Sequence, residues 1–267
     1  MNSVMTRLAW RLSVLRSRWQ SRFGYLLAAP RVYRNWWAMP LPKLGVGVVL
    51  ELRNGLRYKV RPGTTDLAVI NEASILNPYL SAGHTTVAAD AVVVDIGANI
   101  GDFVLQAARL CPAGRVFAIE PVSEHVEMIQ ENVRLNEVSN VICVKRAIGA
   151  GDGMIQVRLL GNRSSTAQSG EEGATEDVAM TSLERFLTDE GLDRIDLLKL
   201  DCEGAEWDIL PAAEAVLPRV RQIAMEFHSG RGWTPERLAE WLRDRGYRVW
   251  HTPGPWNGLL WATREFC

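Results

Sequence analysis

Acidic residues that end apolar stretches, together with two glycines, are the part of this sequence best suited to chemistry on a small molecule. The β-branched run Val92–Asp95 ends in an acid, and an apolar periodicity typical of a helix begins at Ile100. In an open α/β sheet, ligands lie at the carboxyl ends of the strands, where a glycine lets the backbone approach them. The helix that follows offers amide groups and a partial positive charge to an anionic group. The predicted ligand contacts in this stretch are Asp95, Gly97, Ala98, Asn99 and Gly101.

The spacing of the glycines distinguishes between two nucleotide-like ligands. A dinucleotide site uses Gly-x-Gly-x-x-Gly, in which the middle glycine leaves room for a pyrophosphate. Here Asn99 occupies that position, and this spacing favours S-adenosylmethionine (SAM), which has a carboxylate and no pyrophosphate. Glu120 ends the next predicted strand, where a carboxylate can accept both hydroxyls of a ribose, but both cofactors use such an acid. A tight turn that binds no ligand is the alternative explanation for the glycines.

A second acidic group follows a later apolar stretch, 195–201. It consists of Lys199, Asp201, Glu203 and Glu206. Asp201 is expected at the same sheet edge as Asp95 and Glu120, and three carboxylates are costly to bring together unless a cation such as Lys199 accompanies them. Acids in the first turn of a helix also interact favourably with its dipole, which is a structural explanation for Glu203 and Glu206.

From Ala91 onward, predicted strands and helices alternate, which favours a mostly parallel sheet with helices on both faces. The predicted strands are 92–95, 116–120, 141–146, 195–201 and 220–227, with closing strands 247–252 and 259–263 that suit a terminal antiparallel hairpin. Helices are expected to end at Leu110 and Leu217 and to begin at Ser123, at the capping box Thr181–Glu184, and at Thr234. Residues 154–160 suit an added strand, and 161–177 a Gly/Ser/Glu-rich loop that could act as a lid.

The first 50 residues differ from the rest in charge, with eight basic residues and no acid. Residues 4–23 fit an amphipathic helix with a basic stripe, which could dock on the protein or on a second subunit, lie on an anionic membrane, or bind nucleic acid. The acidic remainder argues against a nucleic-acid-binding protein. The protein would then be monomeric or a homodimer, with a peripheral membrane contact through residues 4–23 as an alternative.

A hairpin and a helix are predicted between this arm and the alternating region. Asn54-Gly55 is a strong two-residue turn signal between 46–53 and 56–61. Asp66 opens a helical pattern that ends near Pro78, and its side chain could cap that helix or face the ligand pocket. We expect this unit to cover the sheet edge. The predicted division is a basic extension (1–45), a hairpin and helix cap (46–90) and a ligand-binding domain (91–267).

Composition excludes several protein classes. The 47 % apolar content over 267 residues is ordinary for a globular protein. No apolar run reaches the roughly 18 to 20 residues needed to span a bilayer, and no signal peptide is recognisable. The four cysteines form no Cys-x-x-Cys pair, which suggests reduced thiols in a cytoplasmic protein, one that could also lie at the inner membrane surface.

The chain resembles the FkbM family of SAM-dependent methyltransferases from about Arg61 to His228. The resemblance rests on Asp95-Ile-Gly-Ala-Asn-Ile-Gly101, Glu120-Pro121, Asn132 with Asn136, Ala147, Lys199-Leu-Asp-Cys-Glu-Gly-Ala-Glu206 and Glu226-Phe-His228. It implies a class I methyltransferase (Rossmann-like) fold, SAM as methyl donor, and O-methylation of a hydroxyl on a sugar, glycan or secondary metabolite. It also adds Pro121, Ala147 and Asp201 to the expected cofactor contacts.

Methyl transfer to a hydroxyl requires alignment of the reacting groups and benefits from a base. Asp201, Glu203 and His228 are the candidate bases, and Lys199 is the accompanying cation; a purely structural His228 is the alternative. The acids could instead hold a divalent metal that lowers the pKa of the hydroxyl, although no metal is expected. The other hypotheses are N-methylation of a small molecule or peptide, an NAD-dependent oxidoreductase, and a non-catalytic SAM-binding partner protein.

Overall fold

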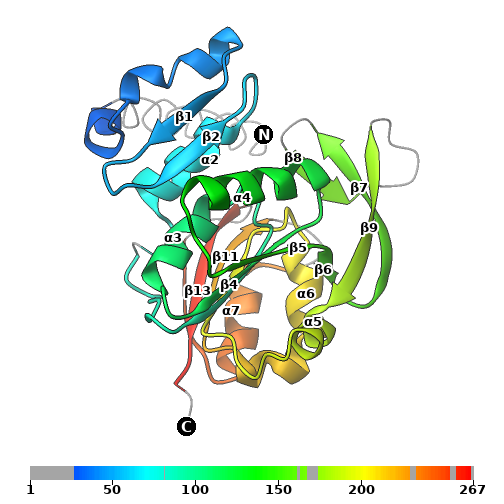
Figure 1. The fold of residues 1–267 in the computed structure, drawn as a ribbon. Coiled ribbons are helices and arrows are strands. Elements are labelled where there is room, and N and C mark those ends of the chain that lie inside the picture. The colour runs from blue at the N-terminus through cyan, green and yellow to red at the C-terminus, as the bar shows by residue number, and fades with distance from the viewer. Residues whose placement is uncertain are drawn as a thin grey trace, which may run out of the picture.

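A seven-stranded, mostly parallel sheet forms the centre of the computed structural model (Figure 1). In spatial order its strands are β12 (Arg248–His251), β13 (Asn257–Thr263), β11 (Gln222–His228), β10 (Leu197–Leu200), β3 (Val92–Ile96), β4 (Arg115–Glu120) and β5 (Val141–Lys145). All neighbours pair in parallel except β13, which is antiparallel to both β11 and β12. The predicted parallel sheet with a terminal antiparallel hairpin is confirmed, and it is the class I methyltransferase fold that the resemblance implies.

The structure describes residues 27–80, 82–160, 163–166, 174–228, 233–252 and 257–265. The predicted helix at 4–23 and most of the predicted loop at 161–177 lie outside these residues. Within them, no helix is long and apolar enough to cross a membrane.

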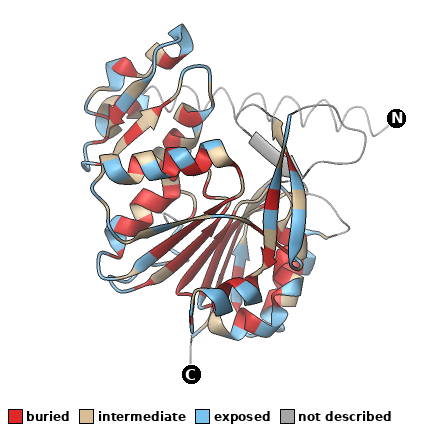
Figure 2. Cartoon of the chain, turned by 45° about the vertical axis from the view of Figure 1, so that its right-hand side comes forward, coloured by how far each residue is buried: buried red, intermediate tan, exposed pale blue. Residues whose placement is uncertain are grey.

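Helices cover both faces of the central sheet. One face carries α3 (Asp102–Leu110) and α4 (Ser123–Leu135), and the other carries α5 (Leu183–Asp189), α6 (Glu206–Ala212), the 3₁₀ turn η4 (Glu214–Arg219) and α7 (Pro235–Arg243). Strands covered on both faces are largely apolar, and Figure 2 shows those at the centre of the sheet as almost continuously buried. The ends of β3, β4, β10 and β11 are therefore fixed by a tightly packed core.

Several predicted helix ends are shifted. Thr234 caps α7 as expected, accepting a hydrogen bond from the Arg237 amide. The cap of α5 is Ser182, one residue after the predicted Thr181. The hydroxyl of Thr181 donates to Asp152 instead. Ser123 is the first residue of α4 but bonds to Glu176. The helix predicted to run to Leu217 is divided into α6 and η4.

A second sheet stands beside the central one (Figure 1). Its order is β6 (Ala147–Gly149), β9 (Thr175–Ser182), β7 (Gly153–Leu160) and β8 (Arg163–Thr166). The added strand is confirmed as β7. The loop prediction for 161–177 is wrong at both described ends, because Arg163–Thr166 pairs with β7 and Thr175 already belongs to β9.

The N-terminal part contains the predicted hairpin and helix. After a helical stretch at 27–32 come the 3₁₀ turns η1 (Trp36–Ala38) and η2 (Leu41–Leu44), the antiparallel strands β1 (Val48–Glu51) and β2 (Arg57–Val60), helix α2 (Asp66–Asn71) and the π-helical turn η3 (Glu72–Leu76). The hairpin packs on α3 and α4, with Leu50 and Tyr58 buried against Leu105 and Met128. The hairpin of the expected cap therefore lies on helices, whereas Val69 of α2 lies beside Asp201 at the carboxyl edge of the sheet.

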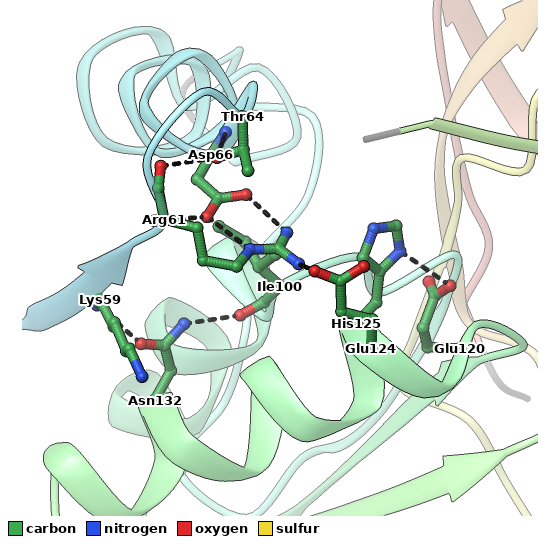
Figure 3. A network of polar contacts seen from close by, with 9 residues as sticks. All are labelled: Lys59, Arg61, Thr64, Asp66, Ile100, Glu120, Glu124, His125 and Asn132. Carbon is green, nitrogen blue, oxygen red and sulfur yellow. Dashed lines mark hydrogen bonds and ion pairs between the residues drawn. The ribbon is translucent and has the colours of Figure 1, made fainter. Parts of the chain in front are cut away.

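Polar contacts fix this hairpin to α4 (Figure 3). The Asn132 side chain accepts from the Lys59 amide (2.9 Å) and donates to the Ile100 carbonyl (2.9 Å). Asp66 is neither a helix cap nor a pocket residue: its buried carboxylate accepts from the amide and guanidinium of Arg61. The Arg61 guanidinium also pairs with Glu124 on α4. Because Ile100 belongs to the glycine turn, these contacts connect the N-terminal part to the predicted ligand site.

Candidate active site

The two predicted acidic groups meet at the carboxyl edge of the central sheet. They border one cleft of about 940 Å³, a volume that includes the part open to solvent. Predicted residues that line it are Gly97, Asn99, Glu120, Pro121, Ala147, Lys199, Asp201 and Glu203. Asp95, Ala98 and Gly101 are buried next to it, and His228 contacts Glu203 at its border. Ile155 and Val157 of β7 form part of the opposite wall.

The turn between β3 and α3 depends on its two glycines for different reasons. Gly97 (φ +81°) lies so close to β10 that a Cβ there would be 2.0 Å from the Asp201 carbonyl oxygen. Gly101 (φ +83°) has room for a Cβ, which would touch Ile129 at an ordinary 3.5 Å, so its need for glycine is conformational. The close approach at Gly97 is thus to the protein's own backbone, an explanation the sequence pattern did not suggest.

The amides of this turn are mostly engaged within the protein. Gly97 and Ala98 both donate to the Ile119 carbonyl, and Asn99, at φ +48°, donates to Glu120. The expected anion contact therefore falls to the first turn of α3. There Asp102 lines the cleft, and burial raises the pKa of its carboxyl to about 8 against the attraction of Lys199.

Glu120 is buried, with 3 % of its surface exposed, and both of its oxygens are hydrogen-bonded. Oε2 accepts from the Asn99 amide (2.9 Å), and Oε1 accepts from the Val122 amide (3.1 Å) and lies 3.2 Å from His125 Nδ1 (Figure 3). These contacts hold the carboxylate in one orientation at the cleft wall. Oε2 has a further lone pair, so Glu120 can still accept from a ligand hydroxyl.

Lys199 connects the two acidic groups. Its buried ammonium lies 2.9 Å from Asp95 Oδ1 and 3.9 Å from Asp201 Oδ2, and it donates to the Gly97 carbonyl (3.0 Å). Burial favours the neutral amine, but the carboxylates of Asp95 and Asp201 raise the pKa of Lys199 well above its usual range. Lys199 therefore stays protonated and holds the glycine turn against β10. Tyr79 donates to Asp201 Oδ2 (3.0 Å) from the other side.

Four carboxylates surround one imidazole at the ends of β10 and β11, and we call these residues the acidic cluster: Asp201, Glu203, Glu206, Glu226 and His228. His228 Nδ1 lies 3.2 Å from Glu206 Oε1, and its Nε2 lies 3.6 Å from Glu203 and 3.8 Å from Glu226. The Trp207 indole donates to the His228 carbonyl and fixes its backbone. Glu203 has φ +52°, a backbone conformation that often marks functional loops.

The cluster shifts the protonation of its members. Burial opposes a charged imidazole, but the hydrogen bond to Glu206 and the nearby carboxylates raise the pKa of His228 to about 9. Burial raises the pKa of Glu226 to about 7, and the charge of Asp201 adds to this effect. The surrounding carboxylates thus favour a positive charge at the position of His228, and burial makes Glu226 easier to protonate than an exposed glutamate.

Three residues at the site, Asp102, Glu226 and Tyr79, were not singled out from the sequence. Glu226 belongs to the block that ends at His228, and its place near the carboxyl end of the fifth parallel strand could have identified it. Tyr79 lies 122 positions from Asp201, and no local pattern signals that contact.

The chain resembles proteins of one methyltransferase family. The family profile "Methyltransferase FkbM domain" matches residues 95–249. "Methyltransferase sdnD" of Sordaria araneosa is 28 % identical over 198 residues, which cover 61 % of this chain and 76 % of that protein. "31-O-demethyl-FK506 methyltransferase FkbM" of Streptomyces tacrolimicus is 30 % identical, covering 59 % and 73 %. "2-O-methyltransferase NoeI" of Sinorhizobium fredii is 27 % identical, covering 52 % and 63 %.

The chain also aligns with a solved structure. The methyltransferase FkbM of Methylobacillus flagellatus KT aligns with 17 % identity and a TM-score of 0.48, over 74 % of this chain. This chain spans 53 % of that protein's length.

Proposed function

The chain belongs to the FkbM family of methyltransferases, and we propose that it transfers the methyl group of SAM to a hydroxyl of a sugar, glycan or secondary metabolite. Two of its relatives are named as methyltransferases acting at numbered oxygens, which supports a hydroxyl acceptor. The observation that carries the proposal is one cleft at the sheet edge, which is lined by the fixed Glu120 and by Asp201 and Glu203 of the acidic cluster.

The residues at the Glu120 end fit SAM. Glu120 can accept a ribose hydroxyl through Oε2, and Ile119 and Ile148 provide apolar surface beside it. The carboxylate of SAM would lie near the first turn of α3, where the helix dipole favours negative charge. When bound, SAM supplies a methyl group activated by its positively charged sulfur. Asp95 and Lys199 would act by holding the turn in place.

The acidic cluster is suited to removing a proton from the acceptor. Asp201 lines the cleft and is held by Tyr79, so it can orient a hydroxyl. Glu226 has a pKa of about 7 and can accept the hydroxyl proton at neutral pH. His228 would serve to keep the surrounding carboxylates in position. Alignment of the hydroxyl would remain the larger part of the catalysis.

The test combines cofactor binding with a search for the acceptor. Isothermal titration of the full chain with SAM and with NAD should give binding with SAM alone. Cell extract incubated with the protein and methyl-labelled SAM should then yield label in a sugar, glycan or small-molecule fraction, at an oxygen atom. Label on nitrogen would replace the proposal with N-methylation, and SAM binding without turnover would indicate a non-catalytic partner protein.

A further inference from the structure

The acidic cluster contains three side chains placed as ligands of one ion. Asp201 follows β10, Glu206 begins α6, and His228 ends β11, and one ligand atom of each lies within 4.8 Å of the others. Metal–ligand bonds to nitrogen and oxygen are about 2.0–2.6 Å long, so ligands on opposite sides of an ion are separated by about 4–5 Å. A single ion can therefore contact all three residues after small side-chain movements.

A buried carboxylate oxygen in this cluster has no hydrogen-bond partner. Glu206 is fully buried, and its Oε1 accepts from the Cys202 amide (2.7 Å) and contacts His228 Nδ1. Its Oε2 receives no hydrogen bond from any described residue. An unsatisfied buried polar group costs about 1–3 kcal/mol, and more when it is charged. This oxygen is the independent indication that the cluster lacks a ligand.

The charges around the three side chains also favour a cation. Glu203 and Glu226 lie 3.6 and 3.8 Å from His228 Nε2, too far for good hydrogen bonds. Lys199 is the lysine in contact with Asp201, at 3.9 Å, but its ammonium lies closer to Asp95 (2.9 Å). Carboxylates combined with one imidazole suit Mn²⁺, Mg²⁺ or Zn²⁺.

We propose that Asp201, Glu206 and His228 bind a divalent cation at the acceptor side of the cleft. Its chemical role rests on the proposed function: the ion would bind the acceptor hydroxyl and promote its deprotonation, with a carboxylate of the acidic cluster that is not a ligand receiving the proton. The ion site itself does not depend on that function, so the two can be tested separately.

The alternative explanation is that no metal ion binds and that His228 is protonated. The positively charged imidazolium would then itself balance the charge of the surrounding carboxylates. The two explanations predict opposite effects of His228→Ala. If the imidazole is a ligand, its removal weakens metal binding. If it is the counter-cation, its removal leaves four carboxylates around a vacated space and strengthens metal binding.

The experiment titrates the chelator-treated full chain with MnCl₂ and follows free Mn²⁺ by electron paramagnetic resonance. One Mn²⁺ per chain with micromolar affinity is expected, and Asp201→Asn, Glu206→Gln and His228→Ala should each weaken it by about tenfold or more. Glu203→Gln is the matched control: it removes the same charge next to His228 from a half-exposed residue, and should weaken binding less than about threefold. Glu131→Gln, on the outer side of α4, should have no effect.

Three outcomes would overturn the ion site: no Mn²⁺ binding at millimolar concentration, equal losses in Glu203→Gln and Glu206→Gln, or tighter binding by His228→Ala. Asp201 is partly exposed, so Asp201→Asn tests the site even if the buried Glu206→Gln fails to fold. SAM titration in chelator distinguishes the two proposals. Retained SAM binding without Mn²⁺ binding rejects only the ion site, and absence of SAM binding rejects the proposed function.

Discussion

Glu120 and Glu206 are both buried glutamates at the same edge of the central sheet, yet their surroundings differ. Both oxygens of Glu120 are hydrogen-bonded, to backbone amides and a histidine. Glu206 has one oxygen without a hydrogen bond from the described residues and lies among other carboxylates. A carboxylate whose two oxygens are both hydrogen-bonded is suited to binding a neutral hydroxyl. A carboxylate with an oxygen that receives no hydrogen bond, next to other carboxylates, is suited to binding a cation. The comparison indicates a cleft with a cofactor end and an acceptor end.

Gly97→Ala should disturb both ends and is expected to have the largest effect. The new Cβ would lie 2.0 Å from the Asp201 carbonyl oxygen, in a left-handed conformation. Overpacking and conformational strain together should lower the free energy of unfolding by about 2–4 kcal/mol. Gly101→Ala is the control, because its Cβ meets only ordinary contacts and should cost about 1–2 kcal/mol. Denaturant unfolding of both variants measures this, and equal losses would contradict the close approach at Gly97.

Asp201→Asn should affect the acceptor end of the cleft and leave the cofactor end unchanged. Loss of a group that orients or deprotonates the hydroxyl should reduce turnover by about 100-fold or more. SAM affinity should change less than about threefold if Asp201 acts on the acceptor and Glu120 is the residue that binds the ribose. His228→Ala and Glu203→Gln are expected to follow the same pattern. Methyl transfer and SAM titration are to be measured on the same preparations, and a parallel loss of SAM affinity would show that the two ends are not separate.

Glu120→Ala should give the opposite pattern. Hydrogen bonds to a charged group contribute about 1.5–3 kcal/mol, so SAM affinity should fall by about 10- to 100-fold. Glu206→Gln, measured by the same calorimetric titration, should leave SAM affinity within about threefold of the parent. Unchanged SAM binding by Glu120→Ala would mean that the ribose lies elsewhere.

The smallest expected effect is a pH dependence at the cofactor end. The pKa of Asp102 is raised to about 8, so its carboxyl is neutral below that pH and becomes negative above it. Since SAM would place its carboxylate nearby, affinity should decrease by a few-fold between pH 7 and pH 9. Asp102→Asn stays neutral and should lose less affinity over this interval, although ionisation of the SAM amine affects both proteins. Titrations at the two pH values with parent and variant provide the comparison, and identical slopes would remove Asp102 from the site.

The sequence was most informative where local pattern determines structure. The strand ends at Asp95 and Glu120 and the hairpin at Asn54-Gly55 were all predicted within one or two residues. The placement of that hairpin on α4 could not be predicted, because it depends on hydrogen bonds from Asn132 and Asn136 over more than 70 positions. At the site, the residue types indicated the ligand chemistry, but whether a buried carboxylate is satisfied depends on backbone amides that no motif encodes.

The hairpin and its partner helix also have a consequence for the order of events during synthesis. Lys59 leaves the ribosome 73 residues before Asn132, the side chain that binds its amide. At about 5–20 residues per second, the hairpin waits roughly 4–15 s for α4 to be made. A lone two-stranded hairpin is marginally stable, so Leu50 and Tyr58 would be accessible during that interval. The N-terminal part is thus translated first but can be completed only after the glycine turn and α4 have formed.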